Sequence, residues 1–463
     1  MKFFLNLTTA IQRKFWLIIS SAFPGFSLKI KRFIFNNLSF DSRLDYASDQ
    51  EIKQLILNQK QAVQNNQKII LMLSVFPFKS PYFGGQLRCN AIFEQYQKAG
   101  YLVIPFVVRD QNASLTESVA IDEVVFPTIC SYRLYQGQYI PYIGDYCAGI
   151  FAQHDSRVIA ALKKRVQYPV DFIQVEHPWL FPLAFKFKNE YPQANNAILV
   201  YSAHNIEAIL KGLMLRQTLA NDHIVNELVR KISELELSSA RQADIVIAVS
   251  EEDQAYLQKQ TNKAVIYIPN AAYQKFASQE RINFWRNKLP SKFFLFVASG
   301  HPPNLIGLFS CLQDSEKVFP KDLKIVLVGS IINTLDQFPD KKRFFSHPRY
   351  IQIGIVAPQD LAAILACAHG ILIPITIGAG TNLKTAEGLL SGKYIISTEL
   401  GMRGFEKYRL SPGVFVCKNP QEFSNQMCAV WQLSDQNFAS FRGNDLTWEY
   451  ALKPLLRIFD QKQ

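Results

Sequence analysis

Residues 374–392, PITIGAGTNLKTAEGLLSG, hold the most informative set of chemical groups in the sequence. Gly378, Gly380 and Thr381 precede a helical pattern that starts at about Asn382. Glycines let a backbone approach a ligand closely, and a helix start presents open amide groups and the positive end of the helix dipole. The segment therefore predicts a binding site for a phosphate group.

Two charged side chains near the start of this helix would complete such a site. Lys384 adds a full positive charge, and Glu387, three residues later, shares its face of the helix and could accept hydrogen bonds from ribose or sugar hydroxyls. The alternative is a glycine-rich loop before an exposed helix whose lysine and glutamate are solvated. Leu383 occupies the third glycine position of a dinucleotide motif, and Tyr394 stands where a P-loop needs Ser or Thr, so both common nucleotide motifs are excluded.

A second glycine pair, Gly84 and Gly85, follows the first apolar strand pattern and precedes a helical pattern that holds Arg88. Its backbone amides could bind a phosphate or a sugar, although a tight turn between strand and helix would also explain the glycines. Ser299 and Gly300 open another loop between a strand and a helix. A nucleotide sugar could dock there, and a simple turn explains that pattern equally well.

Histidines follow two neighbouring strand patterns in the first half of the chain. Glu176 and His177 come after one of them, and His204 and Asn205 come after the next. Ligands of open α/β sheets bind at the carboxyl ends of the strands, so we expect the two histidines to share one site. His204 is the stronger candidate for an acid-base or polar role, against the alternative of a structural histidine with satisfied hydrogen bonds.

The elements that must position these residues are short apolar runs that alternate with helical patterns. The predicted strands cover residues 69–76, 101–108, 172–175, 197–201, 245–249 and 265–268 in the first half, and 293–297, 323–328, 351–353, 370–373 and 394–396 in the second. Runs of this kind are typical of parallel sheets with helices on both faces. The predicted organisation is a basic, aromatic arm with a polar linker (1–66), two doubly wound α/β domains (67–275 and 276–435) and a terminal helix (436–463).

The composition is that of a globular protein, with 48% hydrophobic and 19% charged residues among 463. The formal net charge of +12 favours a phosphate-bearing or anionic-membrane partner. Half of that excess lies in residues 1–40, whose Lys, Arg, Phe and Trp suit an interfacial membrane helix or, equally, a helix packed on the protein's own core. The longest apolar run there is too short to span a bilayer.

The sequence also argues against several chemistries. It contains no D-x-D triplet, so neither a divalent metal nor another cofactor is expected. Its seven cysteines include no C-x-x-C pair, which predicts no zinc site and no disulfide framework and favours a reducing, cytoplasmic location. A G-x-S-x-G elbow and an aromatic and basic array for nucleic acid are both missing, so no nucleic-acid partner is expected.

Taken together, these segments resemble the GT-B glycosyltransferases, and more narrowly the retaining, family 4 type. The resemblance covers roughly residues 67–460. It is carried by Gly84-Gly85, SAHNIE at 202–207, Ile268-Pro269-Asn270, Pro303-Asn304, Val328-Gly329, GAGTNLKTAEGLLSGKYIIST at 378–398, and Trp448 in the terminal helix. It implies two Rossmann-like domains facing a cleft and a metal-independent transfer of sugar from a nucleotide-diphosphate sugar to a glycan or lipid-linked acceptor in cell-surface glycan assembly. The enzyme would work in the cytoplasm or on the cytoplasmic face of a membrane.

The resemblance also implies roles for individual residues. Glu387 matches the second glutamate of an E-x7-E motif, near the donor ribose, and His204 matches a position that often contacts the donor sugar. The donor-phosphate group would be Gly84, Gly85, Gly380, Thr381, Asn382 and Lys384; the donor nucleotide or sugar would also meet Ser299, Gly300 and Gly378; and the acceptor side would include Arg88, Glu176, His177 and Asn205. The first glutamate of the motif is replaced by Ala379. Two alternatives follow: a sugar-nucleotide epimerase, which shares the fold, and a non-catalytic binding or scaffold protein.

Overall fold

The computed structural model describes residues 44–81, 83–110, 119–126, 140–218, 221–315, 318–378 and 381–461. These residues form two compact units. Unit 1 takes the described residues within 44–81, 96–247 and 255–266, and unit 2 takes those within 83–95, 248–254 and 267–461. The basic arm predicted to meet a membrane, residues 1–40, lies outside the described residues.

The first sheet, most of which belongs to unit 1, has seven parallel strands in the order β3-β2-β1-β4-β5-β6-β7. They are β1 (Ile69–Ser74), β2 (Leu102–Asp110), β3 (Glu123–Phe126), β4 (Phe172–Glu176), β5 (Ile198–Ser202), β6 (Ile245–Ala248) and β7 (Val265–Tyr267). In register, Ile70 of β1 lies between Val103 of β2 and Phe172 of β4. All six residues of β1 are buried, as expected for a central strand covered on both faces.

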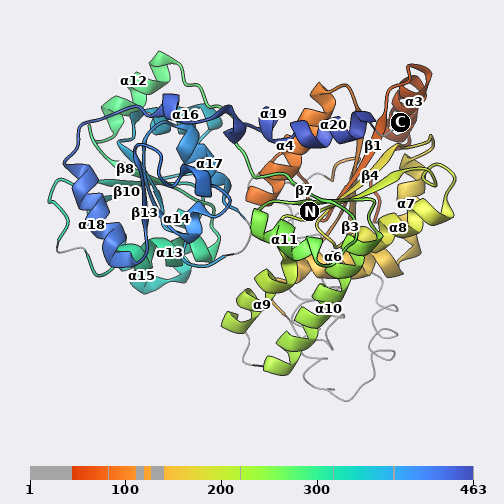
Figure 1. Ribbon diagram of the computed structural model, residues 1–463, viewed down its shortest axis with the longest axis horizontal. Coiled ribbons are helices and arrows are strands. Elements are labelled where there is room, and N and C mark those ends of the chain that lie inside the picture. Colours follow the sequence, from red (N-terminus) through yellow and green to blue (C-terminus); the bar gives the residue numbers. More distant parts are fainter. Residues whose placement is uncertain are drawn as a thin grey trace, which may run out of the picture. The chain divides into compact units, whose positions relative to one another are not determined.

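The second sheet lies in unit 2 and has six parallel strands in the order β10-β9-β8-β11-β12-β13. They are β8 (Phe294–Val297), β9 (Ile325–Val328), β10 (Tyr350–Gly354), β11 (Gly370–Ile373), β12 (Tyr394–Thr398) and β13 (Val414–Cys417). Alternate strand residues enter two separate cores: Phe294 and Phe296 belong to one, and Leu295 belongs to the other. Helices α13 and α18 cover one face of this sheet, and α12 and α16 cover the other (Figure 1). This is a doubly wound domain.

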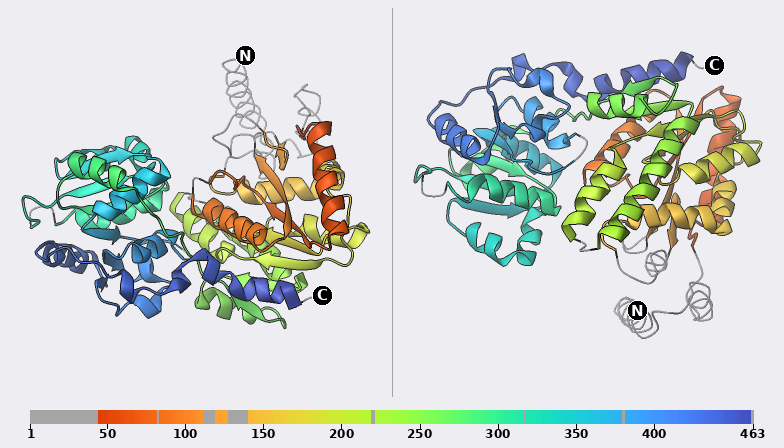
Figure 2. Two further views of the ribbon diagram at one scale, coloured as in Figure 1. Left: turned by 90° about the horizontal axis from the view of Figure 1, so that it is seen from above. Right: turned by 60° about the horizontal axis from the view of Figure 1, so that its bottom comes forward.

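Helices connect the strands in both units. Those before β8 are α3 (Asp49–Gln64), α4 (Gly84–Lys98), α6 (Gly144–His154), α7 (Ser156–Arg165), α8 (Phe181–Glu190), α9 (Glu207–Thr218), α10 (Asp222–Gln242) and α11 (Glu251–Gln258). Those of unit 2 are α12 (Gln279–Lys288), α13 (Pro302–Leu312), α14 (Ile331–Thr334), α15 (Pro339–Phe344), α16 (Pro358–Cys367), α17 (Leu383–Leu390), α18 (Pro420–Trp431), α19 (Trp448–Ala451) and α20 (Lys453–Gln461). Helices α9 and α10 pack side by side (Figure 2).

The structure extends the sequence interpretation at three places. The polar linker is a helix, α3, which starts at a capping box formed by Ser48 and Glu51. Strands β3 and β13 were not predicted from the sequence. The predicted terminal helix is divided between α19 and α20.

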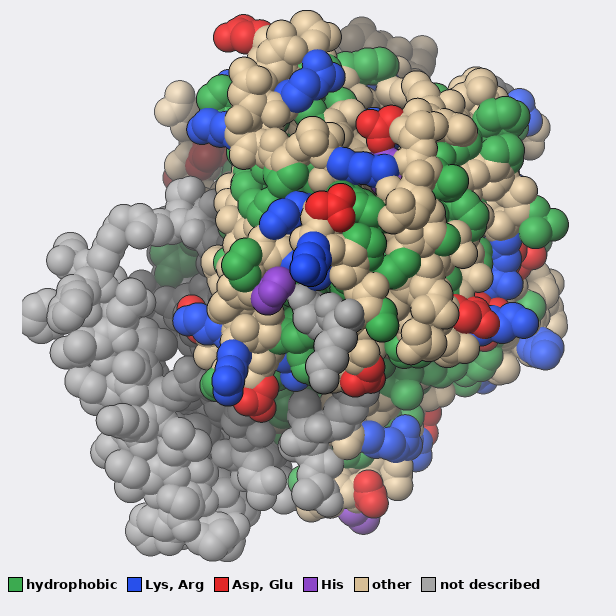
Figure 3. Space-filling model, turned by 90° about the vertical axis from the view of Figure 1, so that its left-hand side faces the viewer, with side chains coloured by type: hydrophobic (Ala, Val, Ile, Leu, Met, Phe, Trp, Pro, Cys, Tyr) green, Lys and Arg blue, Asp and Glu red, His purple; other side chains and the backbone are tan. Residues whose placement is uncertain are grey.

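Among the described residues, no helix combines the length and the apolar character that a bilayer span requires. On the face of the molecule drawn in Figure 3, Lys and Arg side chains are interspersed with Asp, Glu and small apolar groups. The charged side chains of the described residues therefore form no single basic patch on that face.

Candidate functional site

The predicted phosphate loop lies in unit 2, between β11 and α17. Helix α17 begins at Leu383, with Asn382 in an extended conformation as its N-cap, and no side chain caps the helix start. The amides of its first turn are thus directed out of the helix without a capping side chain. Gly380 lies outside the described residues. Gly378 has open space around the position that a Cβ would occupy.

Thr381 is anchored on both sides of the loop. A Cβ on Gly404, which has a φ of +84°, would come within 2.2 Å of Thr381 Cγ2, so only glycine fits there. On the other side, Asn270 Nδ2 donates a hydrogen bond of 3.1 Å to the carbonyl oxygen of Thr381. The hydroxyl oxygen Thr381 Oγ1 is buried and has no hydrogen-bond partner among the described residues. These contacts hold the backbone at Thr381 in place, while its hydroxyl oxygen remains available to a ligand.

Lys384 lies on the first turn of α17 and is partly buried. Its Nζ donates a hydrogen bond of 2.5 Å to Asn304 Oδ1 and lies 5.6 Å from the centre of the Phe296 ring. Asn304 is held in turn by Ser299, whose carbonyl oxygen accepts a hydrogen bond of 3.1 Å from Asn304 Nδ2. Burial lowers the pKa of Lys384 to about 8, although the nearby Glu387 carboxylate opposes the shift. A bound phosphate would compensate this partly desolvated charge.

Glu387, one turn further along α17, is paired with a lysine that the sequence interpretation did not include. Lys275 Nζ donates to Glu387 Oε1 at 2.8 Å. Lys275 belongs to the segment between β7 and α12, 112 residues before its partner. The structure therefore places Lys384 and Glu387 together on α17, as predicted, and adds Lys275 to them.

The second glycine loop and Arg88 lie at the start of α4, within unit 2. A Cβ on Gly84 would lie 3.6 Å from Leu383 Cδ1, so this loop meets the first residue of α17. The buried guanidinium of Arg88 donates to the carbonyl oxygen of Ile268 at 3.1 Å and to Asn270 Oδ1 at 2.9 Å. Because Asn270 also donates a hydrogen bond to Thr381, Arg88 supports the phosphate loop indirectly, through Asn270. These contacts favour a structural role for Arg88 over the predicted acceptor contact.

The loop with Ser299 and Gly300 is held by internal hydrogen bonds. Gly300 donates its amide to Ser330 Oγ at 2.8 Å and accepts a hydrogen bond of 3.0 Å from Thr334 Oγ1. The backbone of Gly300 is therefore occupied in this structure. Contact with a nucleotide at this loop remains a prediction.

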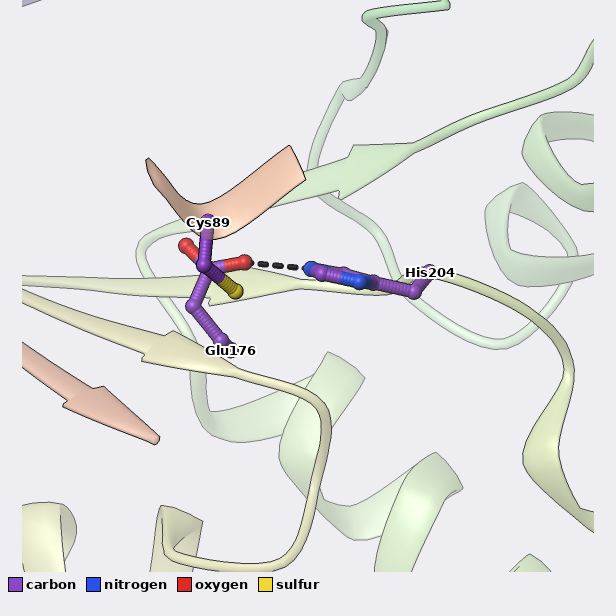
Figure 4. A group of neighbouring side chains, drawn as sticks. All are labelled: Cys89, Glu176 and His204. Atoms are coloured by element: carbon purple, nitrogen blue, oxygen red, sulfur yellow. Dashed lines mark hydrogen bonds and ion pairs between the residues drawn. The ribbon is translucent and has the colours of Figure 1, made fainter. Parts of the chain in front are cut away.

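In unit 1, two histidine and glutamate pairs lie at the carboxyl ends of β4 and β5. His204 Nε2 is 2.5 Å from Glu176 Oε2, as Figure 4 shows, and His177 Nδ1 is 2.8 Å from Glu207 Oε1. The two imidazole rings lie with their centres 4.0 Å apart and their planes tilted by 39°. The two histidines lie next to each other, as expected, and their sharing of one functional site stays a prediction, as do their roles. Asn205 Nδ2 donates to Glu207 Oε1 at 3.2 Å, so it supports the second pair.

His177 shows two signs of a constrained site. Its φ of +63° lies in the left-handed region, which is costly for a residue with a side chain. Its Nε2 is buried and has no hydrogen-bond partner in the described part of the chain. Backbone strain together with an unpaired buried nitrogen is common where a side chain is held for a ligand.

A further buried carboxyl group, Glu236 of α10, contacts the backbone of Glu207. Glu236 Oε1 accepts a hydrogen bond of 2.8 Å from the amide of Glu207. Burial, together with the negative charge of Glu207, raises the pKa of Glu236 to about 8. Burial also acts on Glu207, but hydrogen bonding and charge attraction from His177, with the charge of Lys211, outweigh it and lower the Glu207 pKa to about 2. Glu207 is thus the carboxylate and Glu236 the protonated acid at neutral pH.

Comparisons with known proteins agree on the fold. No protein-family model matches the sequence, and no curated protein is significantly similar to it. Among solved structures, sucrose-phosphate synthase from Thermosynechococcus elongatus matches with a TM-score of 0.63 at 14% identity, covering 85% of this chain and 99% of that one. Anabaena HepE in complex with UDP-glucose matches with a TM-score of 0.56 at 16% identity, covering 85% and 99%.

A third similar structure is the catalytic domain of starch synthase IV from Arabidopsis thaliana bound to ADP and acarbose. Its TM-score is 0.55 at 12% identity, covering 86% of this chain and 99% of that one. Likeness at these identities establishes the fold. The chain has the GT-B fold, with two Rossmann-like domains, and the predicted fold class is confirmed.

Proposed function

We propose that this chain, which has the GT-B fold, is a glycosyltransferase that moves a sugar from a nucleotide-diphosphate sugar to a hydroxyl of an acceptor. The observation that carries the proposal is Lys384: a partly buried ammonium at the uncapped start of α17, hydrogen-bonded to the neutral Asn304. A lysine held in this way suits a phosphate dianion. Solved structures of the same fold include complexes with UDP, UDP-glucose and ADP, which supports a nucleotide ligand.

In the reaction, the bond between the anomeric carbon and the diphosphate oxygen breaks, and a bond to the acceptor oxygen forms. The diphosphate leaves with the electron pair and takes up the proton that the acceptor hydroxyl loses. Lys384, Thr381 and the amides around Asn382 would stabilise the charge that builds on the leaving diphosphate. The backbone of Gly84 and Gly85 would lie close to the phosphates. Gly378, which has no side chain, would let the backbone lie close to the donor.

The other site residues would hold the two substrates. Glu387 would accept hydrogen bonds from the donor ribose, and Ser299 would contact the nucleotide. His204, oriented by Glu176, would contact the transferred sugar, and His177, oriented by Glu207, would face the acceptor. No metal is part of the proposal, because Lys384 and the helix start supply positive charge that compensates the negative charge of the leaving diphosphate.

The finer features of the proposal rest on the sequence resemblance. They are transfer with retention of configuration, independence of metal, an acceptor that is a glycan or a lipid-linked sugar, and a role in cell-surface glycan assembly. The basic residues of the 1–40 segment would hold the protein on the cytoplasmic face of an anionic membrane. Deleting residues 1–40 should then release the protein from anionic vesicles but leave nucleotide binding unchanged.

The function is tested by thermal stabilisation with UDP, GDP, dTDP, CMP and ADP, beside the corresponding sugar nucleotides. A ligand at about 100 times its dissociation constant should stabilise the native state by roughly 2.7 kcal/mol. Lys384→Ala should abolish the shift, whereas Lys288→Ala, which removes an exposed lysine on α12, should retain it. Absence of any shift in the wild type would favour a binding or scaffold protein.

Measuring turnover distinguishes a glycosyltransferase from the remaining alternative, a sugar-nucleotide epimerase. A transferase should release nucleoside diphosphate from a sugar nucleotide in proportion to the acceptor supplied, and its product's anomeric configuration reports retention. An epimerase would instead convert the sugar nucleotide with no acceptor present. Unchanged rates after exhaustive chelation would support metal independence.

A further inference from the structure

Lys275, in the segment between β7 and α12, contacts Glu387 of the candidate nucleotide site. The sequence interpretation gave this segment no role. Its Nζ lies 2.8 Å from Glu387 Oε1, and the two side chains are 25% and 23% exposed. The ion pair is therefore partly shielded from water without being sealed within the protein. A substrate could still reach the carboxylate.

The two lysines near Glu387 have different partners. Lys384, three residues before Glu387 on the same helix, donates to Asn304. Lys275 donates to Glu387 itself, through Oε1. The second oxygen, Glu387 Oε2, has no hydrogen-bond partner within the described ranges of the chain. One lysine is thus available to a phosphate, while the other restrains the carboxylate.

A carboxylate that is already held in place should bind two neighbouring hydroxyls more tightly than a mobile carboxylate does. A glutamate side chain has three rotatable bonds, and ordering them on binding costs affinity. The ion pair through Oε1 restricts the side chain before a ligand binds, so less of that cost remains, and both carboxylate oxygens are held in place. Such an oxygen pair suits two neighbouring hydroxyls better than one.

We propose that Lys275 is a positioning residue that orients Glu387 toward the ribose diol of the nucleotide donor and so sets the preference for ribonucleotides over deoxyribonucleotides. This inference rests on the proposed function, because it needs a nucleotide in the α17 site. It assigns Lys275 no contact with the ligand; Lys275 acts through Glu387.

Calorimetric titration of the full-length protein with UDP, GDP and ADP, each beside its 2′-deoxy and 3′-deoxy analogues, tests the inference. The wild type should bind the ribonucleotide more tightly than either analogue. In Lys275→Ala, affinity for the ribonucleotide should fall about fivefold while affinity for the analogues stays nearly constant, so the discrimination shrinks. Lys275→Arg should restore most of it, because arginine keeps the charge.

Two further variants separate positioning from a structural effect. Glu387→Gln should lose the discrimination to a similar extent, and adding Lys275→Ala to it should change little more, because the lysine then has no carboxylate to orient. Lys288→Ala is the matched control and should behave like the wild type. Melting temperatures should vary little, because the pair is partly exposed.

The outcomes distinguish the inference from the function beneath it. If the wild type binds none of the three nucleotides, the proposed function fails and the role of Lys275 fails with it. If the wild type binds but Lys275→Ala keeps the same affinities and the same ratio between ribonucleotide and analogues, only the role of Lys275 is overturned.

Discussion

Affinity for a nucleoside diphosphate should fall about tenfold between pH 7 and pH 9, because Lys384 loses its charge in that range. Its pKa is lowered to about 8, chiefly by burial. An ordinary lysine, with a pKa of about 10.4, would stay charged throughout. The cause is local: burial of the ammonium group outweighs the opposing negative charge of Glu387, and the hydrogen-bond acceptor of Lys384, Asn304, carries no charge.

The size of the effect follows from proton linkage. A diphosphate binds the charged lysine and holds it charged in the complex, so the apparent dissociation constant rises in inverse proportion to the charged fraction of Lys384 in the free protein. With a pKa of about 8, the constant is raised by a factor of about 1.1 at pH 7 and about 11 at pH 9. The phosphate groups contribute little to this change, because their own last pKa is about 6.

Titrations at half-unit intervals of pH, at constant ionic strength, would measure this dependence. Lys384→Arg is the control: arginine keeps its charge across the range, so any affinity it retains should be flat above pH 7. Affinity that is constant to pH 9 in the wild type would refute the argument. A fall of equal size in Lys384→Arg would assign the titration to another group.

Three further predictions concern residues around the two sites. Glu176→Gln removes the charge that faces His204 and should lower turnover by about tenfold to a hundredfold in a steady-state assay, while nucleotide affinity stays unchanged; an unaltered turnover would remove His204 and Glu176 from the mechanism. Asn270→Ala deprives the buried Arg88 of one acceptor and Thr381 of one donor, so urea denaturation should show a loss of about 1–3 kcal/mol, and an unchanged midpoint would contradict the supporting role of Asn270. Glu236 has a folded-state pKa raised to about 8 from 4.5, so the folded state holds a proton that the unfolded state lacks, and the stability of the wild type should fall as the pH rises through that window. Glu236→Gln should weaken this dependence between pH 6 and pH 8, and an identical slope in both proteins would argue against the assignment.

The fold could be predicted from the sequence because parallel strands with both faces buried leave a strong signal. Runs such as residues 69–76 and 370–373 are apolar without alternation and end at glycine or polar residues. Strands β3 and β13, each at an outer position of its sheet, were not predicted. The same regularity predicted the histidines at neighbouring strand ends, where their rings lie against each other at a tilt.

The candidate phosphate loop could also be predicted, because its parts are close together in the chain. Thr381, Lys384 and Glu387 lie within two turns, so helical spacing alone sets their neighbourhood. Their partners could not be predicted in this way. Lys275 and Asn304 are 112 and 80 residues from the side chains they contact, and only the packing of the strands brings them there.

Glu236 was missed for a different reason, and the sequence did contain a signal for it. The helix that holds it has a high density of charges, which is typical of a solvated face. Yet Glu236 stands four residues after Ile232 and eight after Leu228, on the apolar stripe of α10. A carboxyl group on a buried stripe must be protonated, paired or hydrogen-bonded, because burial strongly disfavours an isolated charge. For Glu236, its position on the buried face is therefore a better guide than its charge, and it predicts a hydrogen-bonded partner. That partner is Glu207, which in turn contacts His177.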